Sequence, residues 1–352
     1  MTTKRTTAAA ATEDSVIDYD GVKFICDVRN VEDLLLLPNT NWVIGSGFNL
    51  DPASQNYLHL FNAENETGVA VQACEIAVRP DTTTYPDCAP PDWKTFGPHG
   101  LGLGATVGKH SVLYAVNHGG RQAVEVFDID VSQDRPRFTW TGCVIAPQGF
   151  WPDGVASLPD GGIVVTALTD PTDPDGSMDK LLHGEPVGGI KEWHPGVGFT
   201  DIPGTAGFSA PNGVIVSPDG KYIFVALSSG RQVARISRGQ DPPKIDVSPT
   251  GIMPDNLRWS ASGKSILVGG HDLSAERFVE RVQASMAPSN QGGNVDSPFK
   301  ILRMDPQTME MTEVIKSGVY GVMGAGTGAI EVGNKLWVST MKGDRIAIFP
   351  LN

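Results

Sequence analysis

The stretch APNGVIVSPDGKYIFVA, residues 210–226, decides the fold. It places two short β-prone runs, Val214–Val216 and Tyr222–Ala226, on either side of Pro218-Asp219-Gly220. This tripeptide is typical of a hairpin turn, because proline presets φ and glycine accepts a positive φ. Asn212 stands just before the first run, where its amide oxygen could serve a turn or bind a hard cation.

Five further segments repeat this strand–turn–strand pattern. Each joins two apolar runs through a short turn rich in glycine, asparagine or proline, and they span residues 34–44, 100–116, 155–168, 257–268 and 329–339. Their spacing of roughly 40–70 residues is typical of propeller blades. Apolar runs at 124–129, 233–236, 301–304 and 346–349 would supply outer strands. The sequence therefore predicts an all-β fold, a six-bladed β-propeller.

The expected domain organisation is simple. Residues 1–20 are predicted to be disordered, and residues 21–352 to form a single propeller domain. Ser274–Met286 has the spacing of an amphipathic helix and leads into a polar loop. This insertion, around residues 273–298, is either a lid over one end of the propeller or a surface excursion.

The charge of the chain excludes some partners. A formal net charge of −13 disfavours nucleic acid, because phosphate binding needs basic patches. No run approaches the ~20 apolar residues of a membrane span. The N-terminal segment has no apolar core typical of a signal peptide, so we expect a cytoplasmic protein.

The cysteines give no metal motif. Cys26, Cys74, Cys88 and Cys143 form no C-x-x-C pair, which argues against a zinc or redox site. Cys74 and Cys88 flank one loop and could form a disulfide in an oxidising compartment. Free thiols in a reducing cytosol are the favoured interpretation.

Polar residues stand just before the predicted hairpins. In a propeller, the start of each innermost strand faces the axis, so these side chains should converge. They are Glu32, Asp33, His99, Asp153, Asn212, Asp255 and Asn256. Carboxylate and amide oxygens suit Ca²⁺ better than Zn²⁺ or copper. Each residue alone is more simply a solvated turn residue; equivalent placement in successive repeats favours a site.

Several motifs, in this order, resemble the paraoxonase (arylesterase/lactonase) family. They are Glu32-Asp33 before a leucine run, Pro98-His99-Gly100-Leu101, Val116-Asn117-His118, Val124-Glu125-Val126-Phe127, Asn212-Gly213 with Ser217-Pro218-Asp219-Gly220-Lys221, and Asp255-Asn256. The resemblance runs from Glu32 to His271. More distantly, the chain is similar to the gluconolactonase and senescence-marker-protein group.

The resemblance implies a six-bladed propeller with a catalytic calcium deep on its axis. Its ligands would be Glu32, Asp153, Asn212, Asp255 and Asn256. Position 153 departs from the family, which usually has asparagine there; the added carboxylate should strengthen cation binding but weaken the Lewis acidity of the metal. The family's second, structural calcium uses acids that align with Gly154 and Asp33, and glycine at 154 speaks against it.

The resemblance also implies a histidine pair. His99 and His118 match two histidines, of which one activates water and the other orients it. An imidazole titrates near neutrality and can take a proton from water. Without the resemblance, a turn histidine and a strand-end histidine are the simpler interpretation. His271 and Asp170 align with residues near the family's substrate pocket.

The sequence thus predicts a calcium-dependent hydrolase acting on small-molecule lactones or aryl esters. No G-x-S-x-G, H-E-x-x-H or phosphate-loop motif indicates another catalytic plan. Two alternatives keep the same propeller: a non-hydrolytic isomerase or lyase, and a binding propeller that calcium only stabilises. Specificity would reside in segments expected to cross the mouth of the propeller, residues 64–93, 172–195 and 273–298.

Overall fold

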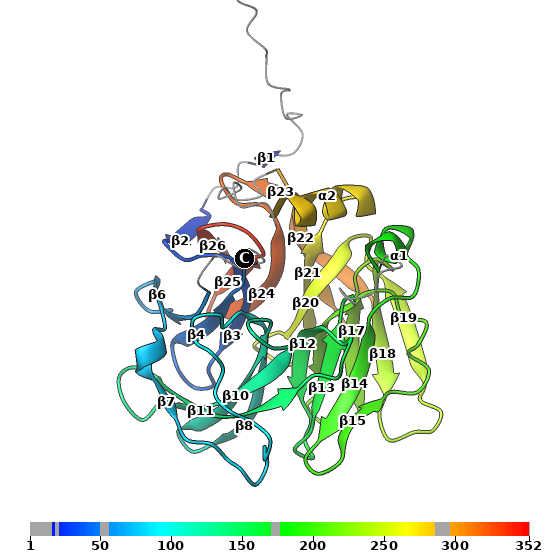
Figure 1. Cartoon of the computed structure of the whole chain (residues 1–352). Coiled ribbons are helices and arrows are strands. Elements are labelled where there is room, and N and C mark those ends of the chain that lie inside the picture. The colour runs from blue at the N-terminus through cyan, green and yellow to red at the C-terminus, as the bar shows by residue number, and fades with distance from the viewer. Residues whose placement is uncertain (1–15, 18–20, 50–55, 170–176, 286–295, 352) are drawn as a thin grey trace, which may run out of the picture.

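The protein is a six-bladed β-propeller, as the sequence predicts. The computed structural model describes residues 16–17, 21–49, 56–169, 177–285 and 296–351. Six sheets are arranged around a central axis, and each runs from an inner strand outward (Figure 1).

Each predicted hairpin forms the two inner strands of one blade. Blade 1 contains β3 (Val31–Leu36), β4 (Trp42–Gly47), β5 (Tyr57–Asn62) and β6 (Thr67–Ala70). Blade 2 contains β8 (Pro98–Val107), β9 (His110–Asn117), β10 (Ala123–Asp130), β11 (Arg137–Ile145) and, at its outer edge, β7 (Ile76–Val78). Blade 3 contains β12 (Pro152–Ser157), β13 (Ile163–Ala167), β14 (Gly189–His194) and β15 (Gly198–Asp201).

The remaining blades follow the same order. Blade 4 contains β16 (Pro211–Val216), β17 (Tyr222–Leu227), β18 (Gln232–Ser237) and β19 (Ile245–Pro249). Blade 5 contains β20 (Met253–Trp259), β21 (Ile266–His271), β22 (Phe299–Met304) and β23 (Met311–Tyr320), with β1 (Val16–Ile17) beside β23. Blade 6 contains β24 (Gly326–Val332), β25 (Lys335–Thr340), β26 (Arg345–Pro350) and β2 (Lys23–Cys26).

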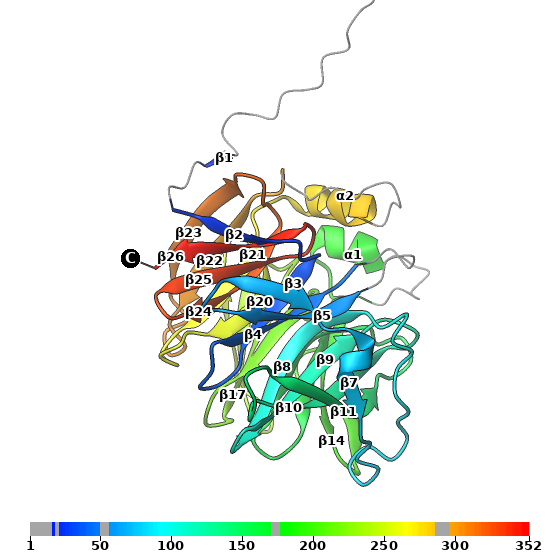
Figure 2. The same ribbon diagram turned by 90° about the vertical axis from the view of Figure 1, so that its left-hand side faces the viewer.

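Both ends of the chain build blade 6. Strand β2, from the start of the chain, pairs antiparallel with β26, from its end, so the ring is closed by hydrogen bonds (Figure 2). Strand β1 lies within the segment predicted to be disordered and pairs in parallel with β23. The rest of residues 1–20 lies outside the described residues.

The core is divided among the spaces between neighbouring blades. Leu35 of blade 1 packs in one cluster with Leu101 and Phe127 of blade 2, and Phe224 of blade 4 packs with Leu257 of blade 5. Burying each such side chain contributes about 1.5–3 kcal/mol. Packing between neighbouring blades therefore fixes their relative positions, and the residues that face the axis lie on a rigid backbone.

Two helices pack together beside the ring. The predicted helix at 274–286 is confirmed as α2 (Ala275–Ser285), whereas α1 (Ser177–His183) was not predicted because it is too short to show a period. Leu181 of α1 and Phe278 and Val279 of α2 share an apolar cluster. Neither helix, in the part of the chain described, has the length and apolarity needed to cross a membrane.

The expectation about the cysteines is wrong. Within residues 64–93, which were expected to cross the mouth of the propeller, β7 instead pairs with the outer strand β11. Cys88 is neither free nor joined to Cys74; it forms a disulfide with Cys143, while Cys74 is exposed and free. Disulfides persist in oxidising compartments, which weighs against the expected cytoplasmic location.

Candidate active site and cation-binding ring

A β-bulge at the start of every inner strand aims one side chain at the axis. The pairing of the first two strands shifts register between Val31 and Asp33 in blade 1, and equivalent shifts occur at the same place in the other five blades. A bulge bends a strand and redirects its side chains. The first position inside each bulge is a polar residue, one from each blade: Glu32, His99, Asp153, Asn212, Asp255 and Thr327.

Glycines let neighbouring bulges approach closely. A Cβ at Gly154 would lie 2.7 Å from the carbonyl oxygen of Asn212, and one at Gly213 would lie 2.4 Å from that of Asp255. No real side chain tolerates these contacts. Glycine at 154 is therefore required by packing, and it leaves no carboxylate at that place.

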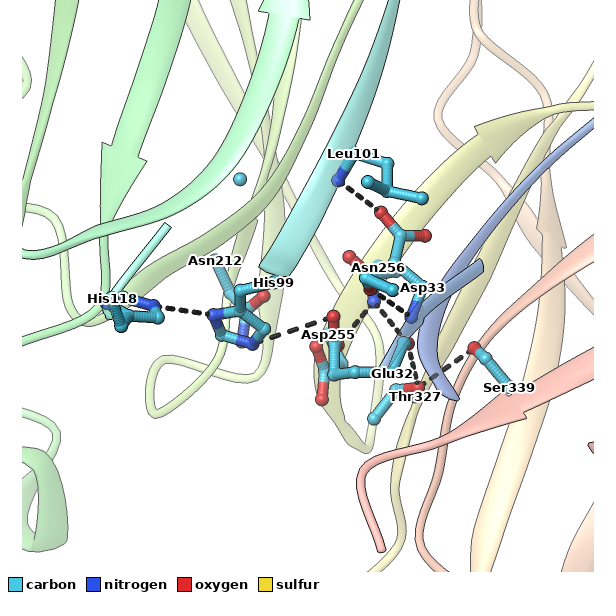
Figure 3. A network of polar contacts seen from close by, with 12 residues as sticks. Glu32, Asp33, His99, Leu101, His118, Asn212, Asp255, Asn256, Thr327 and Ser339 are labelled. Atoms are coloured by element: carbon cyan, nitrogen blue, oxygen red, sulfur yellow. Dashed lines mark hydrogen bonds and ion pairs between the residues drawn. The ribbon is translucent and has the colours of Figure 1, made fainter. Parts of the chain in front are cut away.

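The predicted ligand residues are buried together. Glu32, Asp153, Asn212, Asp255 and Asn256 are each at most 7 % exposed. Figure 3 shows Glu32, Asp255 and Asn256 close to one another, with Asn212 behind His99. We call these five residues the acidic ring.

Thr327 is a sixth contributor that the sequence analysis missed. Its hydroxyl donates to the carbonyl oxygen of Glu32 at 2.6 Å and contacts the Ser339 hydroxyl at 2.9 Å. A repeated motif would have located it. Pro-x-Gly begins at Pro98, Pro152 and Pro211, and the equivalent residues 326–328 are Gly-Thr-Gly, with glycine in place of proline.

Hydrogen bonds orient two of the carboxylates. The Asn256 amide nitrogen donates to Glu32 Oε1 at 2.6 Å. His271 Nε2 lies 3.0 Å from Asp255 Oδ2, and the His271 ring is stacked at an angle on Phe278 of α2. His271 is 1 % exposed and holds Asp255 in place; that it lies near a substrate pocket, as the resemblance implies, stays a prediction. Asp170, the other expected pocket residue, lies outside the described residues.

The ring is electrostatically unfavourable without a counterion. Burial raises the pKa of Glu32 well above its usual value, and the charges of Asp255, Asp33 and Asp153 raise it further. Burial likewise raises the pKa of Asp153, with Asp255 and Asp33 adding to the shift. Glu32 and Asp153 therefore resist ionisation, first because they are buried and second because other carboxylates lie near them.

The donor set fits a hard cation. Glu32 Oε2 and Asn212 Oδ1 are buried and have no hydrogen-bond partner among the described residues, and buried oxygens of this kind are costly unless something binds them. The histidine, cysteine, aspartate and glutamate side chains of the described chain form no metal-binding group of three by themselves. Amide oxygens from Asn212 and Asn256 complete this set, and a mixture of carboxylate and amide oxygens suits Ca²⁺.

Asp33 is neutralised inside the chain. Its carboxylate forms a buried ion pair with Arg258, and it also accepts from the backbone nitrogen atoms of Leu34 and Leu101, both at 2.8 Å. Burial nevertheless raises its pKa, and Arg258 lowers it again in part. Asp33 is thus engaged by Arg258 and position 154 is glycine; the expectation against a second calcium stays a prediction.

The two predicted histidines are in contact. His99 Nδ1 lies 3.0 Å from His118 Nε2, and His99 Nε2 lies 3.5 Å from Glu32 Oε2 (Figure 3). His99 thus stands between His118 and the acidic ring. Burial lowers the pKa of His99 to about 4. Burial, and then the neighbouring His99, hold the pKa of His118 well below its usual value.

The surroundings of His118 decide where its proton sits. Gln122 Oε1 lies 2.7 Å from His118 Nδ1, and the indole nitrogen of Trp151 contacts the same atom. An amide oxygen can only accept and an indole N–H can only donate. A hydrogen bond to Gln122 therefore requires a proton on His118 Nδ1, whereas a hydrogen bond from Trp151 requires that Nδ1 be unprotonated. Phe48 stacks on His99, with ring centroids 4.5 Å apart.

Comparisons with known proteins show the fold alone. No family model matches the chain, and no curated protein does. Among solved structures, the chain is similar to a gluconolactonase from Xanthomonas campestris, at 12 % identity and a TM-score of 0.54, covering 94 % of this chain and 89 % of the other. It is also similar to virginiamycin B lyase from Staphylococcus aureus, at 13 % identity and a TM-score of 0.50, covering 94 % and 99 %. A luciferin-regenerating enzyme matches at 11 % identity and a TM-score of 0.52, covering 94 % and 95 %. Gluconolactonase-like propellers are thus among its structural neighbours.

Proposed function

We propose that this protein is a calcium-dependent hydrolase that opens lactones or cleaves aryl esters. The observation that supports it best is a buried acidic ring, in which two oxygens lack a hydrogen-bond partner among the described residues, beside a pair of imidazoles in contact. The ring needs a cation, and the imidazoles can take up a proton. Hydrolysis of an ester uses both properties.

The acidic ring would hold the cation. Glu32, Asp153 and Asp255 would balance its charge, and Asn212 and Asn256 would add neutral oxygens. Bound there, Ca²⁺ supplies Lewis-acid polarisation of the ester carbonyl and stabilises the negative charge that develops on its oxygen.

His99 would be the general base. Its Nε2 faces the acidic ring, 3.5 Å from Glu32 Oε2, so a water molecule at the edge of the ring is within its reach. His99 Nε2 takes a proton from that water, and the water oxygen bonds to the carbonyl carbon. The bond from that carbon to the leaving oxygen of the lactone or ester then breaks, and the departing oxygen takes the proton back from His99 Nε2. A lactone yields a hydroxy acid.

His118 would orient His99. When His118 Nδ1–H donates to Gln122, His118 Nε2 accepts from His99 Nδ1–H, and His99 Nε2 keeps its lone pair for water. Low pKa values keep both rings neutral at neutral pH. Phe48 and Trp151 line the pair with aromatic surface that suits a lactone or an aryl group.

The test is hydrolysis of a panel of lactones and aryl esters, with chelator and then with calcium restored. Activity should disappear with chelator and return with calcium. Asn212→Ala should lose bound calcium, and His99→Gln should retain calcium but lose turnover. His110→Gln is the matched control, because His110 is an exposed histidine on β9 that pairs with Asp128. Calcium binding without turnover on any substrate would favour a binding propeller instead.

A lyase is the second candidate, supported by the likeness of the fold to virginiamycin B lyase. In an elimination, the base removes a proton from carbon and the product gains a double bond without gaining water. Turnover in ¹⁸O-labelled water distinguishes the two. Hydrolysis incorporates one labelled oxygen into the acid, whereas elimination incorporates none.

A further inference from the structure

One buried amide joins the two segments that carry the histidines. Asn117, the last residue of β9, is fully buried. Its side-chain oxygen accepts from the backbone nitrogen of Gly97 at 3.0 Å and from that of Gly119 at 2.8 Å. Gly97 precedes His99 by two residues, and Gly119 follows His118 directly. This side chain therefore helps to set the distance between the two histidines, together with the backbone bond from His118 N to the carbonyl oxygen of Gly97 at 3.1 Å.

A buried carboxylate holds that amide. The Asn117 amide nitrogen donates to Glu125 Oε1 at 2.9 Å. Glu125 is also fully buried, and it accepts from Arg121 Nε at 2.9 Å, Arg121 Nη2 at 2.7 Å and Trp140 Nε1 at 2.8 Å. A carboxylate with this many donors has a fixed orientation. Arg121 in turn precedes Gln122, which contacts His118 Nδ1.

We infer that Asn117 and Glu125 form a positioning unit that sets the contact between His99 and His118 and, through Arg121, the place of Gln122. The inference rests on the proposed function, in which that contact orients the general base. Asn117 and Glu125 do not touch the acidic ring or the reacting atoms in this scheme. They are positioning residues rather than catalytic residues.

The local packing leaves no substitute for these hydrogen bonds. A Cβ at Gly119 would lie 1.4 Å from the carbonyl oxygen of Thr95, so backbone packs directly against backbone at this point and leaves no room for another side chain. Loss of the Asn117 oxygen would leave the buried N–H of Gly97 and the half-buried N–H of Gly119 without an acceptor, which proteins avoid by moving the backbone. Such a movement would change the distance between the imidazoles directly.

The experiment compares Asn117→Asp, Glu125→Gln and the double variant. Asn117→Asp keeps the oxygen that Gly97 and Gly119 need but places a second carboxylate oxygen against Glu125. In Asn117→Asp we expect the two imidazoles to move relative to each other. A displacement of ~1 Å is enough to lower kcat by on the order of 100-fold. The double variant restores a donor–acceptor pair between positions 117 and 125 with its polarity reversed, so it should recover part of the activity. KM and calcium affinity should change little in all three.

Glu192→Gln is the matched control. Glu192, on β14, accepts from Arg238 Nε at 2.9 Å and Arg238 Nη2 at 3.1 Å, the same two-point contact as Glu125 with Arg121. It lies in the third strand of blade 3, away from the axis-facing strand. This variant should keep kcat, and it should lose less stability than Glu125→Gln because the Glu192 side chain is 18 % exposed whereas Glu125 is fully buried.

The ring nitrogen signals of His99 and His118 in ¹⁵N NMR give a readout independent of turnover. They should shift in Asn117→Asp and return toward the wild-type positions in the double variant. Unchanged signals, with kcat kept at the wild-type level as in the control, would overturn the inference. If the wild type shows no hydrolysis but the signals shift as described, the proposed function fails and the positioning unit stands. If Asn117→Asp does not fold, Glu125→Gln alone decides, because it keeps the shape of the side chain.

Discussion

The guanidinium of Arg258, on β20 of blade 5, lies against the carboxylate of Asp33, on β3 of blade 1, and both side chains are buried. Arg258 also donates to the carbonyl oxygens of Leu34 at 3.0 Å and Leu101 at 2.9 Å. One side chain thus joins blades 1, 2 and 5. It also supplies a fixed positive charge close to the acidic ring.

Replacing Arg258 with methionine should destabilise the fold strongly. Methionine fills much of the space but leaves the Asp33 carboxylate buried and unpaired, which costs about 3–5 kcal/mol. Adding Asp33→Asn removes the uncompensated charge, so the double variant should be more stable than Arg258→Met alone. Urea denaturation of the four proteins in the cycle gives the coupling energy between the two residues.

An exposed pair provides the control for this cycle. Arg277 and Glu280 on α2 are 3.0 Å apart, with side chains 54 % and 61 % exposed. Arg277→Met should change the free energy of unfolding by less than ~0.5 kcal/mol, since exposed pairs contribute little. Equal losses from Arg258→Met and Arg277→Met would show that the buried pair has no special role.

The fold was predictable because its signal is local and repeated. The run at 210–226 contains two strands and their turn within seventeen residues, and the same pattern recurs in every blade. The acidic ring was predictable for the same reason, since its members precede equivalent strands. Thr327 was missed because the candidate ligands were carboxylates, amides and histidine, and its side chain is an uncharged hydroxyl.

Features made by contacts between distant segments were not predictable. Arg258 reaches Asp33 across 225 positions of sequence, and nothing around either residue indicates the other. The Cys88–Cys143 disulfide joins an irregular segment to the outer strand of blade 2, and sequence spacing does not determine cysteine pairing. His271 was placed in the pocket by resemblance, whereas its bond to Asp255 depends on the register of β20 and β21.

Glu32→Gln should have opposite effects with and without calcium. The raised pKa of Glu32 means that the folded ring disfavours its ionised form, so neutralising it should raise the melting temperature in chelator at pH 7. The amide oxygen can still accept from Asn256. With calcium present, the wild type should gain about 2.7 kcal/mol at a hundredfold excess over Kd, and the variant should gain much less. A variant less stable than wild type in chelator would contradict this electrostatic account.

His59 should make the protein less stable in acid. It is buried on β5, its Nδ1 has no hydrogen-bond partner within the described chain, and burial lowers its pKa from 6.5 to about 4. The unfolded state therefore binds a proton first, and stability falls as the pH drops from about 6.5 to 4. A shift of this size corresponds to about 3 kcal/mol. The difference in unfolding free energy between wild type and His59→Gln should change across that window and be constant above pH 7.5.

Two neighbours of His118 should affect catalysis in opposite ways. Gln122 and Trp151 both contact His118 Nδ1, one as an acceptor and the other as a donor. Only the contact with Gln122 leaves a lone pair on His99 Nε2 for water, so Gln122→Met should lower kcat by roughly tenfold, the loss of part of a general-base contribution. Trp151→Phe keeps the aromatic wall and removes the competing donor, so kcat should be kept or should rise. Steady-state kinetics on the best substrate of the panel decides. A loss of kcat in Trp151→Phe but not in Gln122→Met would assign the opposite tautomer to His118 and would make His99 Nε2 a proton donor.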